Sequence, residues 1–254
     1  MNLNYHIKKI RTNGLTIIED FYTSKHCDNL IKISEEIIAN KLIKKKNKIS
    51  NTCQIINSPF QFNKIFYKSI FQTEIDKLLR KIIDDDYVLI NSNIINRKKS
   101  TKFSSKGITI GETWHTDTRY VGNKKLPKGF SYIVFTMLSD FTKENGATEY
   151  IPGSHHLESR PKRYKNYKKK LITGKKGSLA IFDTSLWHRG GKPSNIDRWS
   201  IYSYYGPWFM KPYFRFPDML KNKKQEINKS LKKILHFNST PPLNDDERLH
   251  TLTK

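Results

Sequence analysis

His115 and Asp117 stand two positions apart, and a third residue with metal-binding chemistry, His188, follows much later in the chain. On an extended segment, residues two apart direct their side chains to the same face. If His188 folds back onto that face, two imidazoles and one carboxylate can hold a metal and leave its other side open. Such a ligand set is typical of non-haem Fe(II) enzymes that activate oxygen. A lone His-x-Asp triplet is common, so the prediction depends on the surrounding sequence.

The elements expected to position these residues are short strands that begin near residue 87. Turn residues such as Pro127, Gly146 and Pro152 separate runs rich in β-branched and aromatic side chains. Several short strands at this spacing favour a β-sandwich or barrel. The predicted strands cover residues 87–96, 130–138, 148–151, 177–183, 185–188 and 198–205, and the motif lies in 108–118.

Helices are expected on both sides of this β region. A strand over 14–21 leads into a helix over 23–39, for which Thr23 offers an N-cap. Apolar residues at helical spacing predict further helices over 70–83 and 219–235. No repeat or linker divides the chain. We therefore predict one domain over 1–254, with the N-terminal strand and helices in 12–83, the β core in 87–210 and a C-terminal helix and tail in 218–254.

Two longer segments resemble the phytanoyl-CoA dioxygenase family. They are ENGATEYIPGSH, residues 144–155, and GSLAIFDTSLWH, residues 177–188. The sequence WHTD at 114–117 precedes them in the family's order, Arg198 follows, and the resemblance covers roughly residues 12–212. It implies a mainly β protein with flanking helices around a double-stranded β-helix (jelly-roll) core, and an enzyme that uses Fe(II), 2-oxoglutarate and O2.

The resemblance assigns the three metal ligands to His115, Asp117 and His188. Oxidative decarboxylation of 2-oxoglutarate at iron supplies the oxidant that attacks an unactivated C–H bond, while the protein orients the parts. Related halogenases carry a small residue at the carboxylate position to make room for chloride. Asp117 therefore favours hydroxylation or another oxidation over halogenation, with release of succinate and CO2. The structural alternative is a hydrogen-bonded His–Asp pair on a packed strand.

Three residues are expected to bind the cosubstrate. Arg198 lies ten residues after His188, a spacing that places it on the next strand, and in the family this arginine holds the C5 carboxylate of 2-oxoglutarate. A guanidinium can bind a carboxylate through two hydrogen bonds. Ser200 follows on the same face, and Thr136 lies in the buried run 130–138, although a backbone hydrogen bond would satisfy its hydroxyl equally well. The loop at Arg97 departs from the family pattern, so no role is transferred to it.

The substrate is expected to be a small anionic molecule. The chain has 47 basic and 23 acidic residues, a net charge of +24, and nine basic residues without an acidic one between Arg160 and Lys176. Arg119 continues the alternation of His115 and Asp117 and is our candidate substrate residue, with a rim or structural role as the alternative. The lysine excess also fits a codon bias toward AT, in which case the charge has no function.

Two other functions remain open. Oxygenases of the AlkB type act on nucleic acids, share the His-x-Asp, His and Arg order and would explain the charge. They carry a second arginine six positions after the first, where this chain has Tyr204. A non-catalytic jelly-roll binding protein is the other alternative, although the complete residue set argues against it.

The compartment is expected to be the cytoplasm. The N-terminal residues lack an apolar signal core, and no run approaches the ~18 apolar residues that span a bilayer. Cys27 and Cys53 have no metal-ligand spacing and are expected to be ordinary thiols. The sequence does not predict an oligomeric state.

Overall fold

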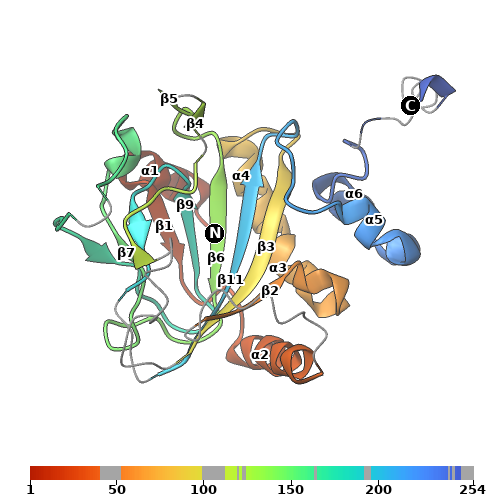
Figure 1. Ribbon diagram of the computed structural model, residues 1–254, viewed down its shortest axis with the longest axis horizontal. Coiled ribbons are helices and arrows are strands. Elements are labelled where there is room, and N and C mark those ends of the chain that lie inside the picture. The colour runs from red at the N-terminus through yellow and green to blue at the C-terminus, as the bar shows by residue number, and fades with distance from the viewer. Residues whose placement is uncertain are drawn as a thin grey trace.

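A six-stranded antiparallel sheet forms the centre of the computed structural model (Figure 1), with strand order β1-β9-β6-β11-β3-β2. The structure describes residues 1–40, 53–98, 112–118, 120–121, 124–162, 165–191, 196–239, 241 and 244–246. The strands of the large sheet are β1 Leu15–Ile18, β2 Cys53–Asn57, β3 Val88–Arg97, β6 Tyr132–Met137, β9 Leu179–Asp183 and β11 Arg198–Gly206.

A smaller sheet covers one face of the large one. It consists of β7 Glu149–Tyr150, β8 Lys170–Leu171 and β10 His188–Arg189, in the order β10-β7-β8. A bridge between His115 and His188 joins the motif segment to this sheet. A separate hairpin follows the motif, formed by β4 Tyr120–Val121 and β5 Lys124–Lys125. The two facing sheets form the predicted jelly-roll core.

The register of β11 decides which side chains face the interior between the sheets. Residues directly opposite each other in an antiparallel pair lie on the same face. Ser200 pairs with Met137, which belongs to the interior cluster, and Tyr204 is itself part of that cluster. Trp199 and Ile201 belong instead to the cluster under the helices. Even-numbered positions of β11 therefore point into the jelly roll.

Helices cover the other face of the large sheet. The helices α1 Leu3–Asn13, α2 Ser24–Ala39, α3 Tyr67–Ile70 and α4 Thr73–Ile82 contribute apolar residues to one cluster with the outer face of the sheet. Leu30 and Leu78 are fully buried within it. The Thr23 hydroxyl accepts the N–H of His26, so the predicted N-cap of α2 is confirmed.

The C-terminal region adds short helices beside the same cluster. These are α5 Phe216–Met219, a 3₁₀ helix over Lys221–Glu226 and α6 Lys229–Ile234, at the right of the sheet in Figure 1. Further 3₁₀ turns lie at Pro59–Gln61, Lys64–Phe66 and Ser154–His156. Within the described residues, no helix has the length and apolar character needed to cross a membrane.

Two predicted helices are interrupted in the structure. The helix predicted over 70–83 is divided because Phe71 and Gln72 take extended conformations between α3 and α4. The helix predicted over 219–235 begins again after Asn228, whose side chain accepts the N–H of Leu231 and caps α6. Helix α1 and strand β2 were not predicted. The strands predicted over 87–96, 130–138, 148–151, 177–183 and 198–205 are confirmed as β3, β6, β7, β9 and β11. The segment predicted over 185–188 is a turn up to Trp187, and only His188 belongs to a strand, β10. In the motif segment, positions 108–111 lie outside the described residues, and the described part has one isolated bridge, at His115.

Candidate metal centre

Three potential ligands from distant parts of the chain meet at one point. One ligand atom from each of His115, Asp117 and His188 can be chosen so that all three lie within 4.8 Å of one another. Nε2 of His188 lies 3.2 Å from Oδ2 of Asp117, and Nε2 of His115 lies 3.9 Å from its Oδ1. The structure thus brings the predicted ligand set together.

Main-chain hydrogen bonds hold the two segments in place. His115 and His188 exchange both N–H···O bonds, each 3.0 Å long, as a hydrogen-bonded antiparallel pair does. The N–H of Asp117 then donates to the carbonyl of Thr184, 2.9 Å away. The position of all three ligands is therefore fixed by backbone geometry.

The two imidazoles are oriented by carbonyl groups two residues earlier. Nδ1 of His115 lies 2.7 Å from the Thr113 carbonyl, and Nδ1 of His188 lies 2.9 Å from the Leu186 carbonyl. A carbonyl only accepts, so each Nδ1 carries a proton and each Nε2 is the atom left to bind a metal on the side of Asp117. Metal-binding histidines are commonly fixed in this way. The donor set fits a divalent transition metal.

The pKa values of the two histidines are shifted in opposite directions by burial and by the nearby charges. Burial, followed by the neighbouring His188, lowers the pKa of His115 to about 4. Burial also acts to lower the pKa of His188, but the charge of Asp117, its hydrogen bond and the Leu186 carbonyl leave that pKa raised. His115 is therefore neutral near pH 7, the form in which imidazole binds a metal.

Arg198 is a buried cation on the interior face of β11. Only 6% of the residue is exposed, and its guanidinium donates to the Gly146 carbonyl and lies 4.5 Å from the centre of the Phe141 ring. Burial lowers the pKa of Arg198 to about 10, so the group remains charged at neutral pH. Among the described residues, no carboxylate forms an ion pair with it, whereas Arg97 pairs with Glu112 at 3.2 Å. A buried, unpaired guanidinium is suited to an anionic ligand.

The other predicted site residues have different positions. Ser200 faces the interior beside Arg198 and donates weakly to the Ile95 carbonyl at 3.4 Å. Thr136 pairs in register with Ile201 and Leu179, which both belong to the helix-side cluster. It therefore lies on the wrong face of the sheet for the role in cosubstrate binding that we predicted. The choice was wrong because position 136 is out of phase with the interior positions of β6.

Arg119, the predicted substrate residue, lies outside the described residues, as do positions 163–164 of the basic segment.

One interior residue was missed by the sequence analysis. Tyr202 lies between Ser200 and Tyr204 on the inner face of β11, and Thr148 forms a hydrogen bond with its side chain. Burial raises the pKa of Tyr202, so its hydroxyl stays protonated. Alternation from Arg198 along β11 was the signal that would have identified it.

The flanking tryptophans pack on the outer side of the site. Tyr167 lies between Trp114 and Trp187, with ring centres 5.6 and 5.4 Å away. Arg189 lies over Trp114 at 4.6 Å. His155 has a structural contact, since its Nε2 lies 3.1 Å from the Arg11 carbonyl and ties the turn to α1. These aromatic residues support the ligand segments from behind.

Comparison with known proteins agrees with this geometry. The family model described as phytanoyl-CoA dioxygenase (PhyH) matches residues 10–198. A protein of Aspergillus fumigatus named dioxygenase af480 is 33% identical over 109 residues, which are 40% of this chain and 35% of that protein. The match thus spans about a third of that relative's length.

Solved structures share the fold. HygX from Streptomyces hygroscopicus, solved with nickel, 2-oxoglutarate and hygromycin B bound, has a TM-score of 0.65 at 13% identity, over 84% of this chain and 90% of HygX. SnoN, described as a non-haem α-ketoglutarate-dependent epimerase from nogalamycin biosynthesis, has a TM-score of 0.62 at 13% identity, over 81% of this chain and 83% of SnoN. At this identity the likeness concerns the fold.

Proposed function

Because the chain belongs to the phytanoyl-CoA dioxygenase family, we propose that it is an Fe(II)- and 2-oxoglutarate-dependent oxygenase that hydroxylates a small anionic metabolite. The products besides the hydroxylated substrate are succinate and CO2. The observation that carries this proposal is the cluster of His115, Asp117 and His188, with ligand atoms within 4.8 Å of one another.

The two Nε2 atoms and the Asp117 carboxylate are the groups that would hold Fe(II). Bound iron would supply the oxidative chemistry, in which O2 and 2-oxoglutarate are consumed together. The protein's own role is to hold the three ligands in place before the metal binds. The reciprocal hydrogen bonds of His115 and His188, and the carbonyls of Thr113 and Leu186, do so without a change in protonation at Nδ1.

Arg198 is the group that would bind the far carboxylate of 2-oxoglutarate. A buried guanidinium costs free energy unless an anion accompanies it, and the described residues provide no carboxylate partner. Ser200, on the same face, can donate a hydrogen bond to that carboxylate in exchange for its weak bond to the Ile95 carbonyl. The cosubstrate would thus be oriented with one end at Arg198 and the other toward the metal ligands.

A contact near the metal segment supports an anionic substrate. The guanidinium carbon of Arg160 lies 3.9 Å from the ring centre of Tyr120, whose hydroxyl lies 3.5 Å from that of Thr116. The start of the basic segment 160–176 is therefore next to the residue between His115 and Asp117. The positive charge of Arg160 near the motif segment, and the net charge of +24, support the proposal of an anionic substrate.

The test is succinate release from 2-oxoglutarate with Fe(II), across a panel of acidic metabolites, with oligonucleotides as competitors. We expect turnover that His188→Ala abolishes and that one class of small acid stimulates. Stimulation by single-stranded DNA instead would identify a nucleic-acid oxygenase. Nickel binding that survives both His115→Ala and His188→Ala would refute the proposed metal centre.

A further inference from the structure

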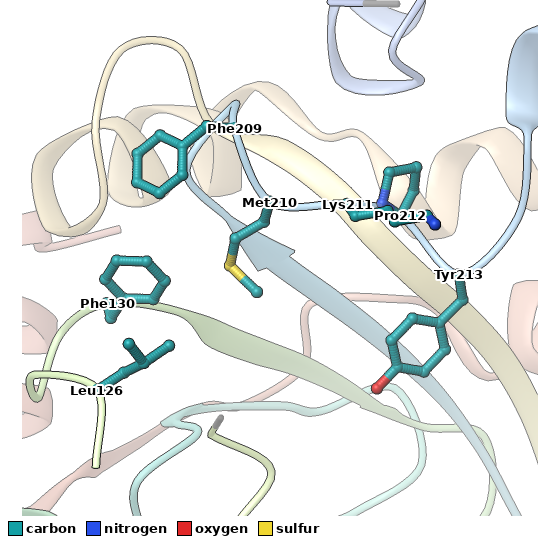
Figure 2. A pocket seen from close by; sticks show the side chains of 7 residues that line it. All are labelled: Leu126, Phe130, Phe209, Met210, Lys211, Pro212 and Tyr213. Atoms are coloured by element: carbon teal, nitrogen blue, oxygen red, sulfur yellow. The ribbon is translucent and has the colours of Figure 1, made fainter. Parts of the chain in front are cut away.

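An apolar hollow lies between the segment before β6 and the turn after β11. It has a volume of about 400 Å³ and is lined by Leu126, Phe130, Phe209, Met210, Lys211, Pro212 and Tyr213. Figure 2 shows Phe130 and Leu126 facing Phe209 and Met210, with Tyr213 farther along. The Phe209 side of the hollow is open to solvent, since that residue is 61% exposed and Tyr213 is 49% exposed. A concave apolar site of this volume has room for an apolar group of a ligand.

A series of contacts links the hollow to the segment that holds Asp117. The Tyr213 ring of the hollow packs against Tyr204 at the end of β11, with ring centres 6.4 Å apart. The Tyr204 hydroxyl lies 3.4 Å from the hydroxyl of Ser131, which is 2.7 Å from that of Thr184. Thr184 in turn accepts the N–H of Asp117 at 2.9 Å. Side-chain contacts and one main-chain hydrogen bond therefore link the hollow to the backbone of Asp117.

Two carboxamides lie on the inner face of β3 beside this chain of contacts. Asn91 pairs in register with Tyr204, and Asn93 pairs with Tyr202, so all four share the interior face. In the described part of the chain, neither Asn91 Oδ1 nor Asn93 Oδ1 has a hydrogen-bond partner, although both atoms are buried. A buried acceptor without a donor costs about 1–3 kcal/mol. Both acceptors lie on the interior face that they share with Tyr202 and Tyr204, so a hydrogen-bond donor on a substrate bound in this interior would satisfy them.

We propose that the substrate is amphipathic, with an apolar chain or ring in the hollow and a hydroxyl or amine donating to Asn91 or Asn93. This inference rests on the proposed oxygenase function and specifies its substrate class. The cation Lys211 also lines the hollow, which allows the apolar part to end in an acidic group. The hollow, the two carboxamides and the metal ligands then form one continuous site.

The test uses straight-chain alkanoates, from butanoate to decanoate, as probes. Their dissociation constants are measured by titration calorimetry on the full chain loaded with Ni(II) and 2-oxoglutarate. Ni(II) takes the place of iron and thereby prevents turnover. Each methylene that enters the hollow should tighten binding about fourfold, the equivalent of 0.8 kcal/mol. Phe209→Ser, at an exposed position, should reduce this dependence on chain length. The control Tyr5→Ser alters another exposed aromatic residue, in α1, and should leave the dependence on chain length unchanged.

The polar half is tested with alkanoates that carry a hydroxyl at C2, C3 or C4. At least one should bind about fivefold more tightly than its unsubstituted parent, because it completes a neutral hydrogen bond. Asn91→Leu combined with Asn93→Leu should remove this preference and keep the dependence on chain length. A wild-type protein without dependence on chain length, or an equal dependence in Phe209→Ser, would overturn the inference. Succinate release by the wild-type protein tests the oxygenase function separately, so the two failures can be told apart.

Discussion

Replacement of Arg198 by methionine tests the proposed cosubstrate site most directly. Methionine has a similar length and is apolar, so the substitution removes the charge while it preserves much of the packing against Phe141. A hydrogen bond to a charged group contributes about 1.5–3 kcal/mol, and a guanidinium can make two to one carboxylate. The loss of roughly 3–5 kcal/mol corresponds to a KM for 2-oxoglutarate that rises about 100- to 5,000-fold.

The assay measures succinate release against 2-oxoglutarate concentration at saturating Fe(II), together with nickel binding in the absence of cosubstrate. We expect Arg198→Met to raise the KM and to leave nickel affinity within about threefold, because the arginine does not contact the ligand atoms. Arg80→Met is the control. That arginine pairs with Asp76 in α4, on the helix side of the sheet, and its loss should change neither quantity.

An Arg198→Met protein that folds and keeps the wild-type KM for 2-oxoglutarate would refute the reasoning. Parallel loss of nickel binding and cosubstrate binding would also contradict it, since that result indicates a structural role. Denaturant unfolding separates the cases. The substitution removes a buried cation that has no carboxylate partner among the described residues, so the free energy of unfolding should not fall by more than about 2 kcal/mol.

Three further predictions concern metal binding, the face of the sheet that binds the cosubstrate, and the backbone conformation at Gly177. Nickel at 100 times its dissociation constant should stabilise the protein by about 2.7 kcal/mol in thermal unfolding, and His188→Ala should lose this gain. Ser200→Ala should raise the KM for 2-oxoglutarate about tenfold, the effect of one hydrogen bond, whereas Thr136→Val should leave it unchanged. Gly177→Ala should lower the free energy of unfolding by roughly 2–4 kcal/mol in urea, because Gly177 has φ +93° and a Cβ there would lie 2.0 Å from the Tyr22 carbonyl oxygen. A stability equal to that of the unchanged protein would contradict the last prediction.

The sequence predicted residues whose position follows from strand alternation and motif order. His115, Asp117 and His188 meet as expected, because two of them share a face of one segment and the third is delivered by the neighbouring strand. Arg198 was identified from its spacing after His188 and from the family resemblance, because β11 is itself buried at nearly every position. Thr136 was misplaced because every residue of β6 is buried. A strand buried on both faces has no hydrophobic alternation to indicate which side chains point inward.

Features that depend on tertiary contact could not be predicted. Helix α1 is polar overall, but Ile10 is buried and the following Gly14 takes φ +77° against His155. That contact involves a turn far away in the chain, so local pattern carries no sign of it. The same holds for the carboxamides of Asn91 and Asn93. In sequence they are ordinary polar residues in a strand, and only the register with β11 shows that they are enclosed.

Strand β11 is long enough to hold two separate binding sites in the interior, the proposed cosubstrate site and the proposed substrate site. A strand rises about 3.4 Å per residue, so the six steps from Arg198 to Tyr204 span roughly 20 Å. One end presents a buried cation and Ser200, which suit a carboxylate. The other end presents Tyr204 with Asn91 opposite it, and leads to the apolar hollow. A small dicarboxylate held at Arg198 cannot occupy both ends. The second end is therefore left for a different molecule, whose chemistry must match hydrogen-bond acceptors and aromatic rings.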